Sequence, residues 1–264
     1  MWDASNFTLL MLIPGLDEEQ QIGCMQLHAA SDSLMLFTSR PQIWRFKTGE
    51  QPGVMTFERH KEALLDVCVD SFQFHQALCL DPSGLLTLWS LGAGEQSFSV
   101  YVAPPASQVY GEPPQNPTAV SFDSSFRRLL VGFSRGACRV YNYSNGSVIH
   151  DLLSDASAEI KAITMTPNKG MREELLIASG WNCVTWVWAS KSTEYNIHML
   201  YKLVPRGNVD KMDSLSCQLV VPSSTLFTGS LDGQVCLCVC ACVCVRVCMC
   251  VVSASSTFLN FVHW

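Results

Sequence analysis

The stretch QALCLDPSGLLTLWSLGAGE, residues 76 to 95, contains the pattern that decides the fold. It has a short apolar run, a polar turn with a glycine, and a second run of alternating apolar residues that ends in Trp89. Short runs of this kind, joined by a glycine-bearing turn, predict two antiparallel strands in a hairpin. Glycines follow the second run at once, so we expect the chain to turn again there.

The same pattern recurs along the chain. The other copies are DSLMLFTSRPQIWRFKTGE (residues 32 to 50), RRLLVGFSRGACRVYNYSNGS (127 to 147) and EELLIASGWNCVTWVWAS (173 to 190). Their second runs also close on aromatic residues, which are Trp44, Tyr141 and Trp188. The closing aromatics recur at intervals of 45, 52 and 47 residues, a period typical of an array of β-units.

Apolar segments ahead of three copies supply further strands. They are LLDVCVD (64 to 70), TAVSFD (118 to 123) and IKAITM (160 to 165). Four strands per repeat are typical of a propeller blade. We therefore expect an all-β chain that forms an incomplete β-propeller, with about four full blades and a partial blade at each end.

Most of residues 1 to 237 resembles the WD-repeat β-propellers. Trp2-Asp3 resembles the closing Trp-Asp of a blade, Arg59-His60 resembles the Gly-His ahead of an innermost strand, and Asp232-Gly233 resembles the Asp-Gly of a turn. Arg135 departs from the pattern, because it stands where the turn Asp is expected. The resemblance implies structural and not chemical roles for these positions, which are Trp2, Asp3, Trp44, His60, Trp89, Tyr141, Asn182, Trp188 and Asp232.

Two segments resemble a narrower group of WD-repeat proteins. LLIASGWNCVTWVW and RRLLVGFSRGACRVYNYSNG are similar to segments of long two-propeller proteins that often carry EF-hands and are associated with cilia and flagella. This chain departs from that group because it has no EF-hand loop of the D-x-[DN]-x-[DN]-G type. The resemblance implies a ciliary or axonemal setting.

Charge and cysteine usage limit the classes of partner. Seventeen basic and 23 acidic residues give a net charge of −6, and no block of Lys or Arg occurs, so neither nucleic acid nor a membrane surface is favoured as a partner. Neither a C-x-x-C nor an H-x-x-x-H spacing occurs before residue 235, so we expect no metal and no cofactor. The cysteines before that residue lie in apolar segments, which favours free thiols in the cytoplasm.

One motif could carry chemistry. Gly132-Phe133-Ser134-Arg135-Gly136 matches the G-x-S-x-G of serine hydrolases, in which a helix must follow the turn. The next residues, ACRVYNYSNGS, alternate like a strand, so we expect a β-turn and no catalytic role for Ser134. The sequence favours a non-enzymatic scaffold that binds other proteins through propeller faces and loops. The alternative is a propeller domain accessory to a serine hydrolase or another enzyme.

A proline-rich insertion, VAPPASQVYGEPPQNP, occupies residues 102 to 117. Proline lacks the N–H that a strand needs, so we expect this insertion to project as a loop. A second interpretation is a polyproline ligand for an SH3-type groove through Pro114-x-x-Pro117.

The tract VCLCVCACVCVRVCMCVV, residues 235 to 252, interrupts the last repeat. A tetrahedral metal site does not fit cysteines in line along a strand, a membrane helix does not fit Arg246, and a disulfide framework does not fit a reducing compartment. Every residue type in the repetitive part has a codon within one base of GTG or TGT, which favours a translated GT-repeat. We therefore expect the propeller to occupy residues 1 to 235, and residues 236 to 264 to be a non-native or disordered tail.

Overall fold

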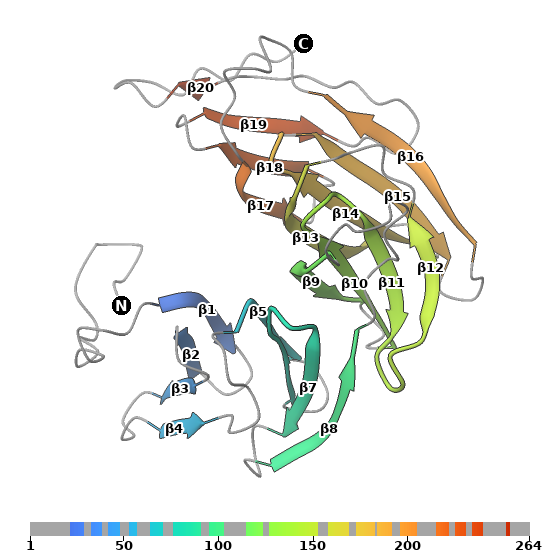
Figure 1. The fold of residues 1–264 in the computed structure, drawn as a ribbon. Helices are drawn as coiled ribbons and strands as arrows, with labels where there is room; N and C mark the ends of the chain where they lie inside the picture. Colours follow the sequence, from blue (N-terminus) through green and yellow to red (C-terminus); the bar gives the residue numbers. More distant parts are fainter. Residues whose placement is uncertain are drawn as a thin grey trace. The chain divides into compact units, whose positions relative to one another are not determined.

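The protein is described by a computed structural model. The described residues are 22–28, 33–38, 42–47, 53–56, 64–70, 76–90, 95–102, 115–123, 127–152, 158–168, 173–182, 184–191, 196–204, 215–221, 225–230, 234–239 and 252–253. Their backbone forms five four-stranded antiparallel sheets (Figure 1). The prediction of an all-β chain built from four-stranded units is confirmed.

The chain divides into two compact units, Met1–Leu64 and Leu65–Trp264. The first unit contains one sheet, whose strands pair in chain order. These strands are β1 (Ile22–His28), β2 (Ser33–Thr38), β3 (Gln42–Lys47) and β4 (Gly53–Thr56).

The second unit contains the other four sheets, each again paired in chain order. The first two consist of β5 (Asp66–Asp70), β6 (Gln76–Leu80), β7 (Leu85–Ser90) and β8 (Glu95–Tyr101), and of β9 (Pro117–Phe122), β10 (Arg128–Phe133), β11 (Cys138–Asn142) and β12 (Val148–Leu152). The last two consist of β13 (Ile160–Asn168), β14 (Glu173–Gly180), β15 (Thr185–Lys191) and β16 (Ile197–Leu203), and of β17 (Leu215–Val221), β18 (Thr225–Ser230), β19 (Gln234–Val239) and β20 (Val252–Ser253).

Within the second unit, the first strands of successive sheets lie side by side. β5 contacts β9, β9 contacts β13, and β13 contacts β17 (Figure 1). The fourth strands β8, β12 and β16 each carry exposed residues, whereas every residue of the second strand β10 is buried. The sheets therefore share an inner side made of first strands and an outer side made of fourth strands.

The apolar core lies between neighbouring sheets. On β10, Leu130 belongs to a cluster with the sheet that follows, while Leu129 and Val131 belong to a cluster with the sheet that precedes. On β14, Leu176 faces back toward β10 and Ile177 faces forward toward β18. Because both faces of a middle strand are covered, the sequence reads there as an unbroken apolar run, as in RLLVGF.

The closing aromatics hold the same ladder position on the third strand of each sheet. Their cross-strand partners are given by the pairs Leu36↔Trp44, Ala77↔Trp89, Leu129↔Tyr141 and Leu176↔Trp188. In the last sheet the equivalent pair is Leu226↔Cys238, so the ladder places Cys238 where the other sheets have an aromatic. β19 runs across residue 235, the predicted end of the propeller domain.

A β-bulge accompanies three of these aromatics. The register with the fourth strand shifts between Leu88 and Trp89, between Val140 and Tyr141, and between Val187 and Trp188. A bulge places an extra residue on one strand and increases its twist. Since the bulge recurs at one ladder position, it is a feature of the repeat and not a local defect.

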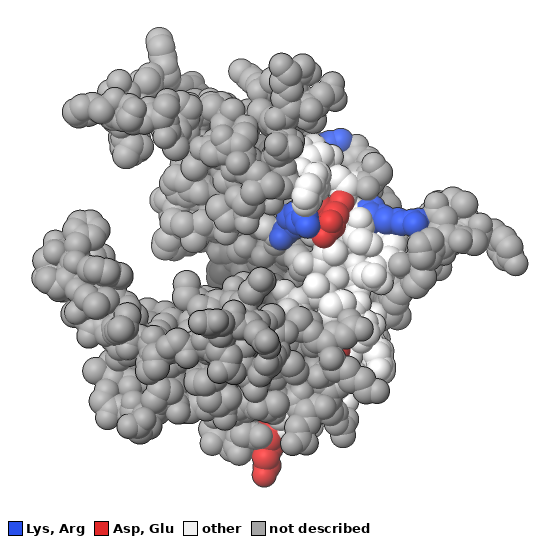
Figure 2. Space-filling view, turned by 60° about the vertical axis from the view of Figure 1, so that its left-hand side comes forward, with Lys and Arg blue, Asp and Glu red and all other residues white. Residues whose placement is uncertain are grey.

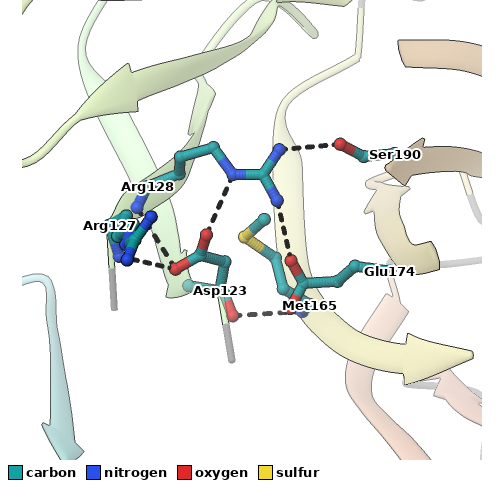
Figure 3. Close-up of polar contacts among 7 residues, drawn as sticks. Asp123, Arg127, Arg128, Met165, Glu174 and Ser190 are labelled. Atoms are coloured by element: carbon teal, nitrogen blue, oxygen red, sulfur yellow. Dashed lines mark hydrogen bonds and ion pairs between the residues drawn. The ribbon is translucent and has the colours of Figure 1, made fainter. Parts of the chain in front are cut away.

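A buried arginine joins two sheets. Arg128, at the start of β10, donates from Nε to Asp123 Oδ2 at 2.9 Å within its own sheet. Across to the next sheet it donates from Nη2 to Glu174 Oε2 at 3.0 Å and from Nη1 to Ser190 Oγ at 2.7 Å (Figure 3). All four residues are buried.

Backbone groups complete this arginine network. Asp123 Oδ1 accepts from the N–H groups of Arg127 and Arg128, at 2.8 and 3.2 Å. Beside them, the Met165 N–H of β13 donates to Ser121 Oγ of β9 at 3.2 Å (Figure 3). Charged groups can be buried when each is paired and hydrogen-bonded, and this network meets that condition.

Candidate interaction surface

The turn between the second and third strands has one geometry in two sheets. Gly84 donates to Asp81 O at 3.0 Å, and Gly136 donates in the same way to Phe133 O at 3.1 Å. Gly84 has a φ of 84° and Gly136 a φ of 83°. This is a three-residue hairpin loop that ends in a left-handed residue, and glycine takes that conformation without strain.

In two neighbouring sheets, β9 to β12 and β13 to β16, a further hydrogen bond joins this turn to the chain that enters the first strand. The Ser134 N–H donates to Asn116 O at 2.9 Å, and the Trp181 N–H donates to Glu159 O at 2.8 Å. In the sheet of β5 to β8 this turn position is Pro82, which has no N–H to donate. In two neighbouring sheets, therefore, the turn and the inter-sheet connection are held together at the same end.

The two turns are brought together by a close approach between the sheets. A Cβ added to Gly132, at the end of β10, would lie 2.5 Å from Ile160 Cγ2 at the start of β13. Only glycine allows this approach. The resulting surface, called the turn face below, contains Ser134, Arg135, Glu159, Lys161, Trp181 and Asn182.

Trp181 is the prominent residue of the turn face. It is 47% exposed, although tryptophan is usually mostly buried. Lys161 Nζ lies 4.6 Å from the centroid of its ring, and the same Nζ lies 2.8 Å from Glu159 Oε1. On the face drawn in Figure 2, basic and acidic side chains adjoin within a largely uncharged described surface. An exposed indole fixed beside an ion pair is suited to binding and requires no chemistry of its own.

Comparison with known proteins identifies the fold. No family model matches the chain, and no curated protein matches it. Many solved structures do match it, among them the WD40 repeats of RRP9 and U3-55K, with TM-scores of 0.61 and 0.60 and 15% identity each. The fold is that of WD40 propeller blades. The matches cover 83% of this chain but only 60% and 61% of those two chains, so the chain spans about three fifths of their length.

The likeness to these WD40 structures is one of fold alone at this identity. The predicted class, an all-β chain of WD-repeat propeller blades, is confirmed by it, with the four-stranded sheets as blades. Five such sheets are described, where about four full blades and a partial blade at each end were predicted. The narrower resemblance to ciliary two-propeller proteins finds no support in these matches and stays a prediction.

Three of the WD-repeat positions lie buried on third strands of blades. Trp89, Tyr141 and Trp188 are 7%, 0% and 2% exposed, and Trp89 Nε1 donates to Thr87 Oγ1 at 2.9 Å. Trp44 lies on the third strand of the first blade. The positions that lie outside the described residues are Trp2, Asp3, His60 and Asp232.

Asn182 lies in the turn of its WD40 blade, beside Trp181. Its Oδ1 accepts from the Val184 N–H at 3.2 Å, which closes the turn locally. A Cβ added to Gly180 would lie 2.9 Å from this oxygen. Asparagine and aspartate side chains both accept a hydrogen bond of this kind from the backbone two residues on.

Ser134 does not lie in a nucleophile elbow. β11 begins two residues after Gly136, so strand, turn and strand replace the strand, turn and helix of a hydrolase. Ser134 Oγ accepts from the Asn116 N–H at 3.2 Å, which makes it part of the turn tie. The predicted β-turn and following strand are confirmed.

The end of the proline-rich insertion is a correction to the prediction. Residues 102 to 117 were expected to project as a loop, but Pro117 is the first residue of β9 and is buried. Its Cγ would lie 3.7 Å from a Cβ added to Gly84 of the preceding blade. Proline is tolerated at the first residue of a strand. Because Pro117 is buried, it cannot serve in a polyproline ligand, and that second interpretation is wrong; residues 103–114 lie outside the described ones.

Two ionisable side chains inside the blades have raised pKa values. Burial raises the pKa of the Cys138 thiol to about 12. Burial also raises the pKa of Tyr141 to about 12, although the hydrogen-bonded Arg139 guanidinium acts against this. Since the thiolate is the reactive form, Cys138 is unreactive at neutral pH. Cys79 and Cys138 are buried thiols outside any disulfide, as predicted for them.

Within the described residues, no three His, Cys, Asp or Glu side chains are grouped so that they could hold a metal ion. The same part of the chain has no helix able to cross a membrane. The sequence analysis did not identify Trp181 and Lys161 as surface residues that could bind a partner. The only signal in the sequence was a tryptophan in a turn, where a large apolar side chain has no core to pack into.

Proposed function

We propose that this chain is a non-enzymatic scaffold that binds other proteins through the turn face. The observation that carries the proposal is the exposed Trp181, held against Lys161 by a turn whose N–H is bonded to Glu159 O. Tryptophan side chains contribute strongly to binding energy at protein interfaces. A side chain that is already positioned loses little conformational entropy when a partner covers it.

The blades beneath the turn face support this role because they are rigid. The turn face rests on strands that are buried on both sides, and neighbouring blades are joined by the arginine network. WD40-type folds are typical of protein-interaction scaffolds. A rigid platform with exposed turns allows partners to bind without a large change in shape.

We place the scaffold in the cytoplasm, in a ciliary or axonemal setting. Support comes from the buried thiols of Cys79 and Cys138, which form no disulfide and so suit a reducing compartment, and from the resemblance of residues 127–146 and 175–188 to segments of ciliary proteins.

The proposal is tested by differential capture from a lysate of the source cells. The full chain is compared with Trp181→Ala and with Tyr101→Ala, a matched loss of an aromatic side chain that is 66% exposed on β8, the fourth strand of another blade. We expect captured proteins to fall about tenfold or more with Trp181→Ala and to be retained with Tyr101→Ala, since truncating a hot spot costs about 2 kcal/mol or more. Equal capture by all three chains contradicts the proposal.

The enzymatic alternative has its own test. A fluorophosphonate probe labels activated serines, and we expect no labelling of the full chain because Ser134 lies in a turn tie with Asn116. The control is Ser83→Ala, in the equivalent turn of the preceding blade. Labelling that disappears in Ser134→Ala but persists in Ser83→Ala would favour the hypothesis of a hydrolase-associated domain.

A further inference from the structure

We infer that Trp181 and Glu159 form a site for an arginine side chain of a protein partner, and that Lys161 occupies this site in the free chain. The inference rests on the proposed function, because it names the partner chemistry of the turn face. It goes beyond the proposed function because it specifies that the partner binds through a basic segment and not an acidic one.

Two groups that attract a cation converge on one point. Lys161 Nζ lies 4.6 Å from the Trp181 ring centroid and 2.8 Å from Glu159 Oε1. An aromatic face and a carboxylate each stabilise a positive charge, and tryptophan is the best of the aromatic residues for this. The Trp181 N–H donates to Glu159 O at 2.8 Å, so the segments that carry these two groups are fixed relative to each other.

Lys161 holds this point only loosely. The side chains of Lys161 and Glu159 are 30% and 35% exposed, and the indole is 47% exposed. Water screens an ion pair at this level of exposure, and holding a long lysine side chain in one place costs conformational entropy. Displacement of Lys161 by a competing cation therefore costs little free energy.

Arginine fits the site better than lysine does. Its planar guanidinium stacks on an aromatic face and donates two hydrogen bonds to one carboxylate, which a compact ammonium group cannot do in the same geometry. The net charge of −6 favours the approach of a basic segment. An acidic partner could reach Lys161, but it would approach Glu159 and leave the indole uncovered.

The test measures binding of short labelled peptides to the full chain by fluorescence anisotropy. The probes are three fluorescein-labelled Gly-Ser peptides of equal length, each with two arginines, two lysines or two glutamates at the same places. We expect the arginine peptide to bind in preference to the other two. Trp181→Ala and Glu159→Gln should each weaken its binding about fivefold or more, while Lys161→Ala should tighten it several-fold because the site is vacated.

A control separates local displacement from a change of net charge. Lys191→Ala removes one positive charge from the exposed end of β15 that lies away from the turn, and it should leave binding almost unchanged. The inference is overturned if Lys161→Ala weakens the arginine peptide, if the glutamate peptide binds best, or if neither wild type nor Lys161→Ala binds the arginine peptide. Each of these outcomes leaves the scaffold proposal standing if Trp181→Ala still loses captured proteins.

Discussion

Arg128 Nη2 donates to Glu174 Oε2 across 3.0 Å and thereby joins the second strands of two neighbouring blades. Both side chains are buried, at 7% and 4% exposure. Apolar contacts between blades allow small slips, but a buried charge must meet its partner in one place. The pair therefore fixes how the blade of β9 to β12 sits against the blade of β13 to β16.

Removal of this arginine should destabilise the protein strongly. Arg128→Ala leaves the carboxylates of Asp123 and Glu174 buried without their shared cation, so we expect a loss of about 3 to 5 kcal/mol in the free energy of unfolding. Arg139→Ala is the matched control, since its partner Asp151 is 59% exposed, and such pairs contribute about 1 kcal/mol or less. Urea denaturation at neutral pH measures both, and similar losses would contradict the argument.

The close approach at Gly132 should not tolerate a methyl group. Gly132→Ala places a Cβ within 3 Å of the Ile160 and Ile163 side chains, and we expect a cost of about 1 to 3 kcal/mol. Ile160→Ala removes the nearest of the crowded atoms, Cγ2, although the Cβ of residue 160 stays 2.7 Å from the new methyl, so the double variant should lose less than the sum of the two single variants. Additive losses in denaturation experiments would show that this contact is not tight.

Stability should fall at alkaline pH through Cys138 and Tyr141. Both have a folded-state pKa raised to about 12, from 9.0 and 10.0, because burial disfavours their charged forms. The stability that each contributes is complete below its unfolded-state pKa and is lost as the pH rises toward 12, at up to about 1.4 kcal/mol per pH unit and group.

Substitution separates the two groups. Tyr141→Phe should flatten the loss above pH 10, and Cys138→Ala should flatten the part that begins near pH 9. Unfolding free energies measured between pH 8 and pH 11 provide the test. Unchanged slopes in both variants would mean that neither group titrates differently in the folded and unfolded chains.

The fold was predictable because each repeat carries the same local sequence signals at a regular interval. Hairpin turns such as LDPSG and closing aromatics such as Trp89 and Trp188 are local signals, and they located the third strand of each blade. The prediction that Pro117 lies in a projecting loop was wrong. A strand can begin on a proline because its first residue needs no N–H, and the proline-rich composition does not show where strand pairing begins.

The turn face was not predictable from the sequence. Its residues come from two blades, and the approach that unites them depends on Gly132 against Ile160, which are far apart in the chain. The arginine network likewise joins Asp123 and Arg128 to Glu174 and Ser190. A charged residue at a strand end is usually exposed to water. Only the packing of one blade against the next shows that Asp123, Arg128 and Glu174 are buried.

Cys238 offers the last prediction. Its ladder position, opposite Leu226, is the one at which Trp89, Tyr141 and Trp188 are buried in their blades. A tryptophan buries about 150 to 250 Å², at roughly 25 cal/mol per Å², so Cys238→Trp should raise the free energy of unfolding by up to a few kcal/mol. Leu237→Trp, one ladder position away, is the matched control and should bring no gain. A destabilised Cys238→Trp chain in urea denaturation would mean that this strand does not continue the repeat, and would weaken the prediction that residues 236 to 264 replace a native blade end.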